Sequence, residues 1–204
     1  MWLPPEVLCD SAVVAFARSD DFFFGVLHSR IHEVWALKMG TRLETRPRYT
    51  PTTCFETFPF PKPTPAQEAA IAVAAKELNA LRERWLNPPE WTREEILEFP
   101  ATVGGPWSRF ISPQSPTGNQ KSAIGVARYP RLVPKDPEST AKLAKRTLTN
   151  LYNERPQWLA DAHRKLDTAV FAAYGWPADL SDAALLEKLL ALNLEQVSEG
   201  QSSH

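Results

Sequence analysis

Cationic and amide side chains gather in two segments of this sequence, and their chemistry suits a nucleic acid. The first group, Arg42, Arg46, Arg48 and Tyr49, precedes residues 52–58. The planar guanidinium of arginine donates two hydrogen bonds at once, which suits phosphate oxygens and guanine edges. The second segment, residues 100–135, mixes charges for phosphates with amides for base edges. Its candidates are Arg109, Asn119, Gln120, Lys121 and Arg128.

Residues 100–135 also differ in composition from the rest of the chain. They hold six prolines, four of the eight glycines and five basic residues, but no acidic residue. A long irregular loop inside a compact domain is uncommon, and is usually functional or disordered. The segment is therefore either a DNA-contacting loop or a solvated linker. Residues 178–200 hold five acids and one base, which is why the formal net charge is only −1.

His28 and His32 are spaced four residues apart, so one helix face could present both to a metal ion. A zinc protease motif would need glutamate after the first histidine, and this position is Ser29. No third ligand is evident. We therefore predict no metal site and expect these histidines to cap, pack or make a polar contact.

The tripeptide Asn87-Pro88-Pro89 partly matches the Asn-Pro-Pro-aromatic motif of amino-methyltransferases. The fourth position is Glu90, the motif would follow a predicted helix rather than a strand, and no Gly-rich cofactor turn is present. We interpret these residues as a helix stop. Because no nucleophile motif or phosphate-binding loop occurs either, we predict no catalytic or cofactor-binding residue and no complete active site in this chain.

The spacing of apolar residues and prolines predicts a mainly helical α+β fold, in which a small β-containing region precedes a C-terminal helical lobe. We place the boundary between residues 1–136 and 137–204. Strands are expected at 11–17 and 52–58, and one continuous helix from Asp20 or Asp21 to Met39 is ended by Gly40. Further helices are expected at 66–86, 93–99, 138–153, 156–174 and 182–192, with 100–135 irregular.

Composition narrows the class of protein. With 204 residues and 43% hydrophobic content, the chain can form one compact domain or a domain with an appended lobe. No apolar run is long enough to cross a membrane, and the N-terminus has no signal-peptide pattern. Two cysteines, Cys9 and Cys54, cannot form a disulfide framework. We therefore expect a cytoplasmic protein with no membrane partner.

Several short stretches together resemble the target-recognition region of MmeI-like DNA methyltransferases, the single-chain restriction–modification enzymes. They are Ser29–Trp35 (SRIHEVW), Arg42-Leu43, Arg48-Tyr49 and Thr57–Pro61 (TFPFP). Residues 147–156, 166–167, 170–180 and 189–195 resemble the C-terminal lobe of the same family. Residues 44–47 (ETRP) depart from the family pattern, so a role for Arg46 rests on its own charge and its neighbours Arg42 and Arg48, not on a family contact.

The resemblance implies double-stranded DNA as a partner and methylation of adenine N6 with S-adenosylmethionine by the parent enzyme. The family's methyltransferase and nuclease portions precede this region, so we expect a separate methyltransferase domain or subunit to hold the cofactor. Arg42, Arg46 and Arg48 would contact phosphates. Base edges would be read by Arg109, Asn119, Gln120 and Lys121.

Two other interpretations remain open, because likeness of fold does not establish function. The chain could be an interaction module that docks onto a methyltransferase subunit through a leucine-rich helix. It could also be an inert gene fragment. The leucines of that helix, which would otherwise form ordinary intramolecular core, are Leu185, Leu186, Leu189, Leu190 and Leu192.

Overall fold

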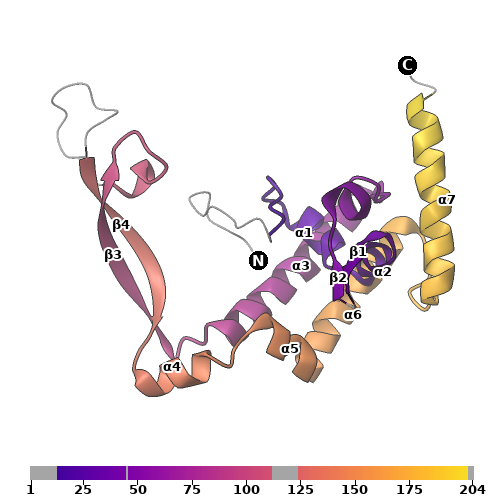
Figure 1. Cartoon of the computed structure of the whole chain (residues 1–204). Coiled ribbons are helices and arrows are strands. Elements are labelled where there is room, and N and C mark those ends of the chain that lie inside the picture. Colours follow the sequence, from indigo (N-terminus) through magenta and orange to yellow (C-terminus); the bar gives the residue numbers. More distant parts are fainter. Residues whose placement is uncertain (1–12, 45, 112–123, 202–204) are drawn as a thin grey trace. The chain divides into compact units, whose positions relative to one another are not determined.

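The computed structural model describes residues 13–44, 46–111 and 124–201 and shows a mainly helical α+β fold (Figure 1). Its two sheets are each a pair of antiparallel strands, so the predicted fold class is confirmed. The described residues form two compact units. We call residues 13–81 with 156–201 the helical unit, and residues 82–155 the ribbon unit. The sequence-based division into residues 1–136 and 137–204 separates regions by their order along the chain, and it stays a prediction.

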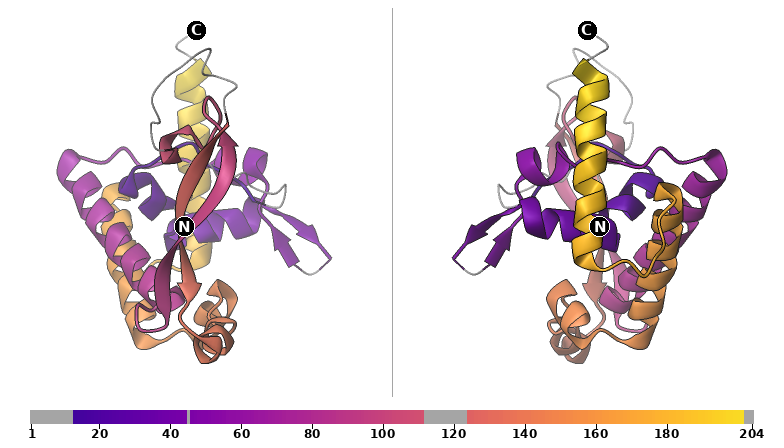
Figure 2. Two further views of the ribbon diagram at one scale, coloured as in Figure 1. Left: turned by 90° about the vertical axis from the view of Figure 1, so that its left-hand side faces the viewer. Right: turned by 90° about the vertical axis from the view of Figure 1, so that its right-hand side faces the viewer.

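The helical unit contains most of the helices and the smaller sheet. Its elements are α1 (Asp21–Leu27), α2 (Arg30–Met39), β1 (Thr41–Leu43), β2 (Arg46–Arg48), the π-helical turn η1 (Pro51–Phe55), most of α3 (Pro65–Leu86), α6 (Gln157–Tyr174) and α7 (Asp182–Gln201). Figure 2 shows β1 and β2 projecting from the end of α2 as a separate hairpin.

The single helix predicted for residues 20–39 is wrong, because the chain forms two helices. Asp20 caps α1 as predicted, its Oδ1 accepting from the Phe23 N–H at 2.8 Å. Ser29 then caps α2, accepting from the His32 N–H at 3.5 Å while its hydroxyl donates to the Val26 carbonyl at 2.7 Å. The apolar periodicity continues through this break, whereas the serine hydroxyl ends one helix and starts the next.

The strands predicted at 11–17 and 52–58 are wrong for the described residues. Residues 14–20 have no regular structure, and Phe16 instead packs edge-on against Phe23. Residues 51–55 form η1, which begins at Pro51 and buries Cys54 completely. Proline suits the first turn of a helix. The threonines and phenylalanines of this segment favour a strand locally, but packing of the aromatic rings outweighs that preference.

The core of the helical unit lies between α1, α2, α3, α6 and α7. A Cβ atom on Gly25 would stand 2.7 Å from Ile71 Cγ2 and 2.9 Å from Ala75 Cβ, so only glycine lets α1 approach α3 this closely. Side chains that are fully buried there are Val26, Ile31, Ile71, Leu78, Leu159, Leu166, Val170, Leu185 and Leu189.

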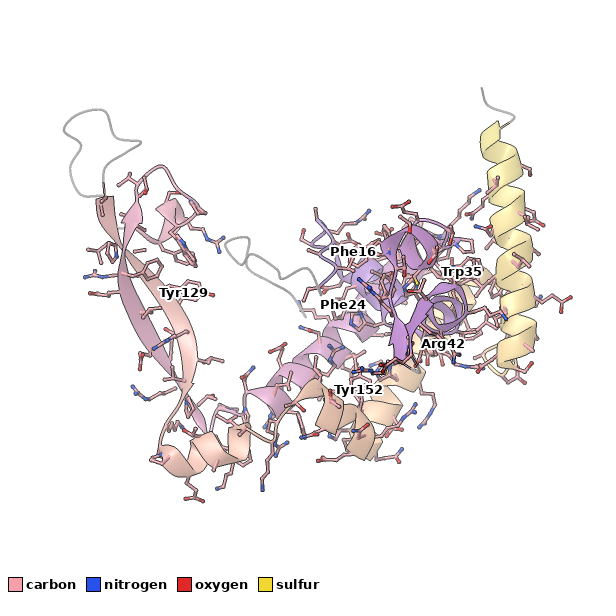
Figure 3. All side chains as sticks on the ribbon, viewed as in Figure 1. Phe16, Phe24, Trp35, Arg42, Tyr129 and Tyr152 are labelled. Atoms are coloured by element: carbon pink, nitrogen blue, oxygen red, sulfur yellow. The ribbon has the colours of Figure 1, made fainter. Side chains whose placement is uncertain are left out.

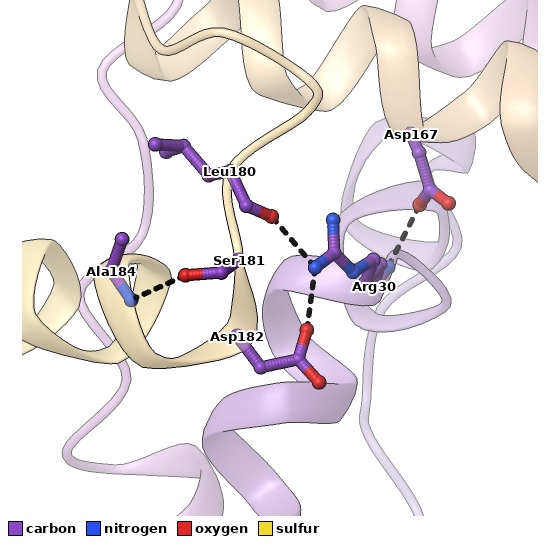
Figure 4. Close-up of polar contacts among 6 residues, drawn as sticks. All are labelled: Arg30, Asp167, Leu180, Ser181, Asp182 and Ala184. Atoms are coloured by element: carbon purple, nitrogen blue, oxygen red, sulfur yellow. Dashed lines mark hydrogen bonds and ion pairs between the residues drawn. The ribbon is translucent and has the colours of Figure 1, made fainter.

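Arg30 fastens the start of α2 to the C-terminal helices (Figure 4). Its backbone N–H donates to Asp167 on α6 at 2.8 Å, so a carboxylate satisfies a free donor of the first helical turn. Its guanidinium donates to the Leu180 carbonyl at 2.8 Å and to Asp182 at 2.5 Å. Ser181 caps α7 as predicted, accepting from the Ala184 N–H at 3.3 Å.

The ribbon unit is built on β3 (Thr92–Thr102) and β4 (Ile124–Pro134), which pair along their full length from Thr92↔Pro134 to Thr102↔Ile124. The helix predicted at 93–99 is therefore wrong, and the irregular structure predicted for 100–135 is wrong for residues 100–102 and 124–134, which form the strands. Glu94, Glu95 and Leu97 favour a helix locally. Pairing with a strand about 30 residues later overrides that preference.

The remaining helices of both units agree in part with the prediction. The helix predicted at 138–153 is two helices, α4 (Pro137–Leu143) and α5 (Leu148–Glu154), because Thr147 caps a new helix. Helix α6 has its predicted bounds and ends at Gly175, whose φ of 68° lies in the left-handed region. Helix α7 runs beyond the predicted end at Leu192.

Candidate nucleic-acid interface

The hairpin of β1 and β2 carries the three arginines predicted to contact phosphates. Arg42, labelled in Figure 3, is paired with Pro47, whereas Arg48 is paired with Thr41. Directly opposed residues share one face of a sheet and successive residues alternate. Arg46 and Arg48 therefore share one face, and Arg42 lies on the other. All three side chains are exposed, so the hairpin presents cations in two directions.

The three arginines differ in their partners. Arg46 pairs with Glu44 at 3.3 Å, and both side chains are about three-quarters exposed, at 77% and 76%. Exposed ion pairs contribute about 0–1 kcal/mol, so Arg46 can exchange Glu44 for another anion at little cost. Within the described residues, Arg42 and Arg48 make no contact with an acidic side chain. These two guanidiniums are therefore available to an external anion.

Gly40 fixes where the hairpin begins. A Cβ atom there would lie 2.6 Å from the Ala36 carbonyl oxygen, 2.8 Å from the Arg48 carbonyl oxygen and 3.3 Å from Cys54 Sγ. The glycine φ is −70°, an ordinary value, so space rather than backbone freedom requires glycine. The ends of α2, β2 and η1 can meet only because this residue has no side chain.

Tyr49 follows β2 directly and is held by a buried histidine. Its hydroxyl oxygen lies 3.0 Å from His32 Nε2. The His32 side chain is only 4% exposed, and this burial lowers its pKa to about 4. Burial, and secondarily the nearby Cys54, raises the pKa of Tyr49 to about 12. Both rings are therefore neutral at pH 7.

The two candidate metal-binding histidines have separate structural roles. His28 lies just after α1, and its Nδ1 is 2.8 Å from the Phe24 carbonyl oxygen. His32 instead contacts Tyr49. The prediction that these residues make capping, packing or polar contacts is confirmed. In the described part of the chain, no three histidine, cysteine or acidic side chains form a group that could hold a metal ion.

The tripeptide at 87–89 is a helix stop, as predicted. Helix α3 ends at Leu86, directly before Asn87. The Pro88 carbonyl accepts from the backbone N–H of Trp91 at 3.0 Å and from the hydroxyl of Thr92 at 2.9 Å. This carbonyl, which would bind the target amino group in a methyltransferase motif, instead closes the turn into β3.

The ribbon pairs each arginine of β4 with an acid of β3. Arg128 Nε lies 2.8 Å from Glu98, and Arg131 lies 2.7 Å from Glu95. The hydrogen bond from Arg131 is the main reason that the pKa of Glu95 is lowered. The cationic character predicted for residues 100–135 is therefore offset by acids just outside that segment. Arg128 is exposed, but its guanidinium is already paired with Glu98.

Aromatic rings pack together where η2 (Ser108–Phe110) folds over the ribbon. Trp107 contacts Phe99 and Tyr129, with ring centroids 5.1 and 5.4 Å apart. Arg109 is exposed, and its guanidinium lies 4.7 Å from the Phe110 ring centre. The other predicted base-reading residues, Asn119, Gln120 and Lys121, lie outside the described residues.

Three positioning features were missed by the sequence reasoning. Gly40 was interpreted only as a helix stop, and the contacts of Arg30 and the acids facing β4 were not foreseen. The spacing of Glu95 and Glu98 could have matched Arg131 and Arg128 on a paired strand, had β3 been recognised. No local signal indicates that Gly40 faces the Arg48 carbonyl.

Comparisons with known proteins relate this chain to DNA methyltransferases and to a target recognition domain. The family model "MmeI, target recognition domain" matches residues 1–62. DNA methyltransferase A of Bacillus subtilis (strain 168) is 28% identical over 78 residues, which cover 38% of this chain and 9% of that protein. In the described part of this chain, no helix is long and apolar enough to cross a membrane.

One solved structure also resembles this chain. It is described as "Structure of Type IIL restriction-modification enzyme MmeI in complex with DNA has implications for engineering of new specificities". The match has a TM-score of 0.55 at 22% identity and covers 88% of this chain and 17% of that one. The chain thus spans a small part of both relatives. It resembles the target-recognition region of MmeI-like enzymes, as predicted, and the β1–β2 hairpin lies inside the matched segment.

Proposed function

We propose that this chain is the target-recognition portion of an MmeI-like adenine-N6 DNA methyltransferase of a restriction–modification system. It binds double-stranded DNA in the cytoplasm, while a methyltransferase domain or subunit outside this chain binds S-adenosylmethionine. One observation carries the proposal. Arg42 and Arg48 are exposed, have no acidic partner among the described residues, and stand on a hairpin inside the segment that matches the recognition domain.

The hairpin would act on the DNA backbone. Arginines that neutralise phosphates release condensed counterions, so the logarithm of affinity falls with the logarithm of salt by about 0.9 per contact. Such contacts set the register of a protein on the duplex without reading sequence. Arg42 and Arg48 lie on opposite faces of the hairpin, and Arg46 adds a third cation when it leaves Glu44.

Sequence reading belongs to the ribbon unit in this proposal. A two-stranded ribbon fits the major groove, where all four base pairs differ in their hydrogen-bonding groups. Arg109, Asn119, Gln120 and Lys121 would contact base edges. Arg128 would keep Glu98 beside it or exchange it for a phosphate. The adenine must leave the base stack for methylation at N6, and the separate methyltransferase domain would complete that step.

Fluorescence anisotropy with a labelled duplex tests the proposal across a series of salt concentrations. The intact chain is expected to bind at low salt and to weaken steeply as salt rises. Arg42→Ala and Arg48→Ala should each reduce the salt slope by about 0.9. Arg164→Ala is the matched control, because Arg164 is exposed on α6 and already paired with Asp161. Absence of binding at low salt, or equal effects of all three variants, would contradict DNA recognition.

An exposed apolar face on the ribbon favours the interaction module as a second candidate. Cross-strand register places four apolar side chains on one face, each about half exposed or more: Ile96 (48%), Ile124 (77%), Val126 (50%) and Leu132 (56%). The same face also carries Glu94 and the Arg128–Glu98 ion pair, so its apolar part lies on either side of charged residues. Such a face is normally covered by another element. The leucine-rich helix is the weaker candidate surface, because Leu185 and Leu189 are fully buried in the helical unit.

The two candidates predict different losses when the apolar face is altered. Val126→Ser should leave DNA affinity unchanged if the ribbon face binds only a methyltransferase subunit. The same variant should weaken capture of that subunit in a pull-down assay. If Val126→Ser weakens DNA binding as strongly as Arg48→Ala does, the face contacts DNA and the interaction-module candidate is wrong.

A further inference from the structure

The hydrogen bond between His32 and Tyr49 has two possible directions. A neutral imidazole carries one proton, so one ring nitrogen donates and the other accepts. Either Nδ1 carries the proton and Nε2 accepts from the Tyr49 hydroxyl, or Nε2 carries it and donates to the Tyr49 oxygen, 3.0 Å away. In the described structure, His32 Nδ1 is buried and has no hydrogen-bond partner.

The surroundings of Nδ1 distinguish the two directions. A proton on Nδ1 would be a buried donor without an acceptor, which is rare and destabilising. The indole N–H of Trp35, one helical turn further along α2, is already a buried donor without a partner. Both residues pack against Phe58, with ring centroids 4.5 and 6.3 Å away. Placing the His32 proton on Nε2 avoids a second such donor in this region.

The direction of this bond determines what Tyr49 can do. When His32 Nε2–H donates to the tyrosine oxygen, the hydroxyl proton must point elsewhere. Within the described residues, the Tyr49 hydroxyl has no other hydrogen-bond partner, and its side chain is partly exposed. The raised pKa of Tyr49, about 12, keeps this proton on the oxygen at neutral pH. Tyr49 is thus a donor without an acceptor, next in sequence to the exposed Arg48.

We propose that His32 positions Tyr49 to donate a hydrogen bond to a phosphate oxygen of the DNA backbone, beside the contact made by Arg48. This inference rests on the function proposed above. A phosphate oxygen accepts hydrogen bonds and donates none, and tyrosine hydroxyls are regular phosphate contacts. The neighbouring guanidinium attracts the same anion. His32 does not touch the DNA and acts only through Tyr49.

The first test concerns the free protein and does not depend on DNA. Nitrogen-15 NMR of the histidine-labelled full chain distinguishes the two ring tautomers, with His32→Gln identifying the His32 resonances. The expected result is a proton on Nε2 at neutral pH. A proton on Nδ1 would overturn the inference, because Tyr49 would then donate its only proton to His32.

The second test measures affinity of the full chain for a labelled duplex. Tyr49→Phe removes only the hydroxyl, and should weaken binding about tenfold, the value of a charge-assisted hydrogen bond, with the salt slope unchanged. His32→Gln retains an N–H near the position of Nε2 and should stay within about twofold of the native chain. His32→Leu should weaken binding as Tyr49→Phe does.

The outcomes separate the inference from the proposed function. If Arg42→Ala and Arg48→Ala weaken binding but Tyr49→Phe does not, DNA recognition stands and the tyrosine contact is wrong. If the native chain binds no duplex, both fail. Should His32→Leu not fold, duplexes with single methylphosphonate substitutions replace it. The effect of Tyr49→Phe should disappear at one phosphate position, and an effect that persists at every position overturns the inference.

Discussion

The carbonyl oxygen of Arg48 lies 2.8 Å from the point that a Cβ atom on Gly40 would occupy. Gly40, which follows α2, and Arg48, the last residue of β2, therefore pack directly against each other. No side chain fits between them. The position of the arginines therefore depends on a residue that carries no functional group. It also depends on Cys54, whose sulfur lies against the same point.

Gly40→Ala should displace the hairpin and weaken DNA binding. Its methyl group would meet two backbone oxygens, and such overpacking typically destabilises a fold by about 1–3 kcal/mol. Anisotropy and thermal unfolding measure the two effects. Gly175→Ala is the control, because its φ of 68° strains the backbone although no atom lies within 4 Å of the added carbon. That variant should lose stability without losing affinity. Equal loss of affinity in both would exclude a specific role for Gly40.

Removing an acid from the ribbon should strengthen nonspecific DNA binding. In Glu98→Gln, Arg128 loses its charged partner, and its guanidinium becomes available to a phosphate. The expected result is a steeper salt dependence, by up to about 0.9 in the slope. Stability should change by less than about 1 kcal/mol because the pair is exposed. An unchanged slope would mean that this face of the ribbon does not approach the duplex.

Stability should fall in mild acid because of His32. Its pKa is lowered to about 4 in the folded chain, whereas the unfolded chain has the ordinary value of 6.5. Below pH 6.5 the unfolded state therefore binds a proton that the folded state does not, and unfolding is favoured by about 1.4 kcal/mol per pH unit. The loss should reach about 3 kcal/mol near pH 4 and be absent above pH 6.5.

Urea unfolding at pH 7 and pH 5 measures this dependence on His32. His32→Gln cannot take up the proton, so its stability should fall less between these two values than that of the native chain. The carboxylates and other histidines are the same in both proteins, so the difference isolates His32. Parallel losses in the two proteins would show that His32 does not stay neutral in the folded state.

Arg30→Met should loosen the start of α7 while leaving α2 folded. The variant loses the hydrogen bonds to the Leu180 carbonyl and to Asp182, but the backbone N–H can still donate to Asp167. Losing a charged hydrogen bond typically destabilises by about 1.5–3 kcal/mol, and less where a partner is exposed as Asp182 is. Hydrogen exchange should accelerate most near residue 185. Uniform acceleration throughout the helical unit would contradict this local role.

Local signals in the sequence identified several elements correctly. Helices α3 and α6 were predicted within a residue or two, because long apolar stripes, Asn87-Pro88-Pro89 and Gly175 fix their ends. Asp20 and Ser181 were recognised as caps. The cluster at 42–49 and the resemblance of its surroundings to a recognition domain also came from the sequence, since arginine spacing and short motifs are local.

Only the tertiary structure decided how those parts work together. Residues 93–99 became a strand because residues 127–133 pair with them, and that pairing also placed Glu95 and Glu98 against the arginines of β4. The lack of space for a side chain at Gly40 and the burial of His32 are likewise caused by residues that are distant in sequence or on another element. Composition and periodicity report the preferences of neighbouring residues. They do not show which distant backbone atom or ring will contact a given side chain. That contact determines the protonation state and the hydrogen-bond partner of the side chain.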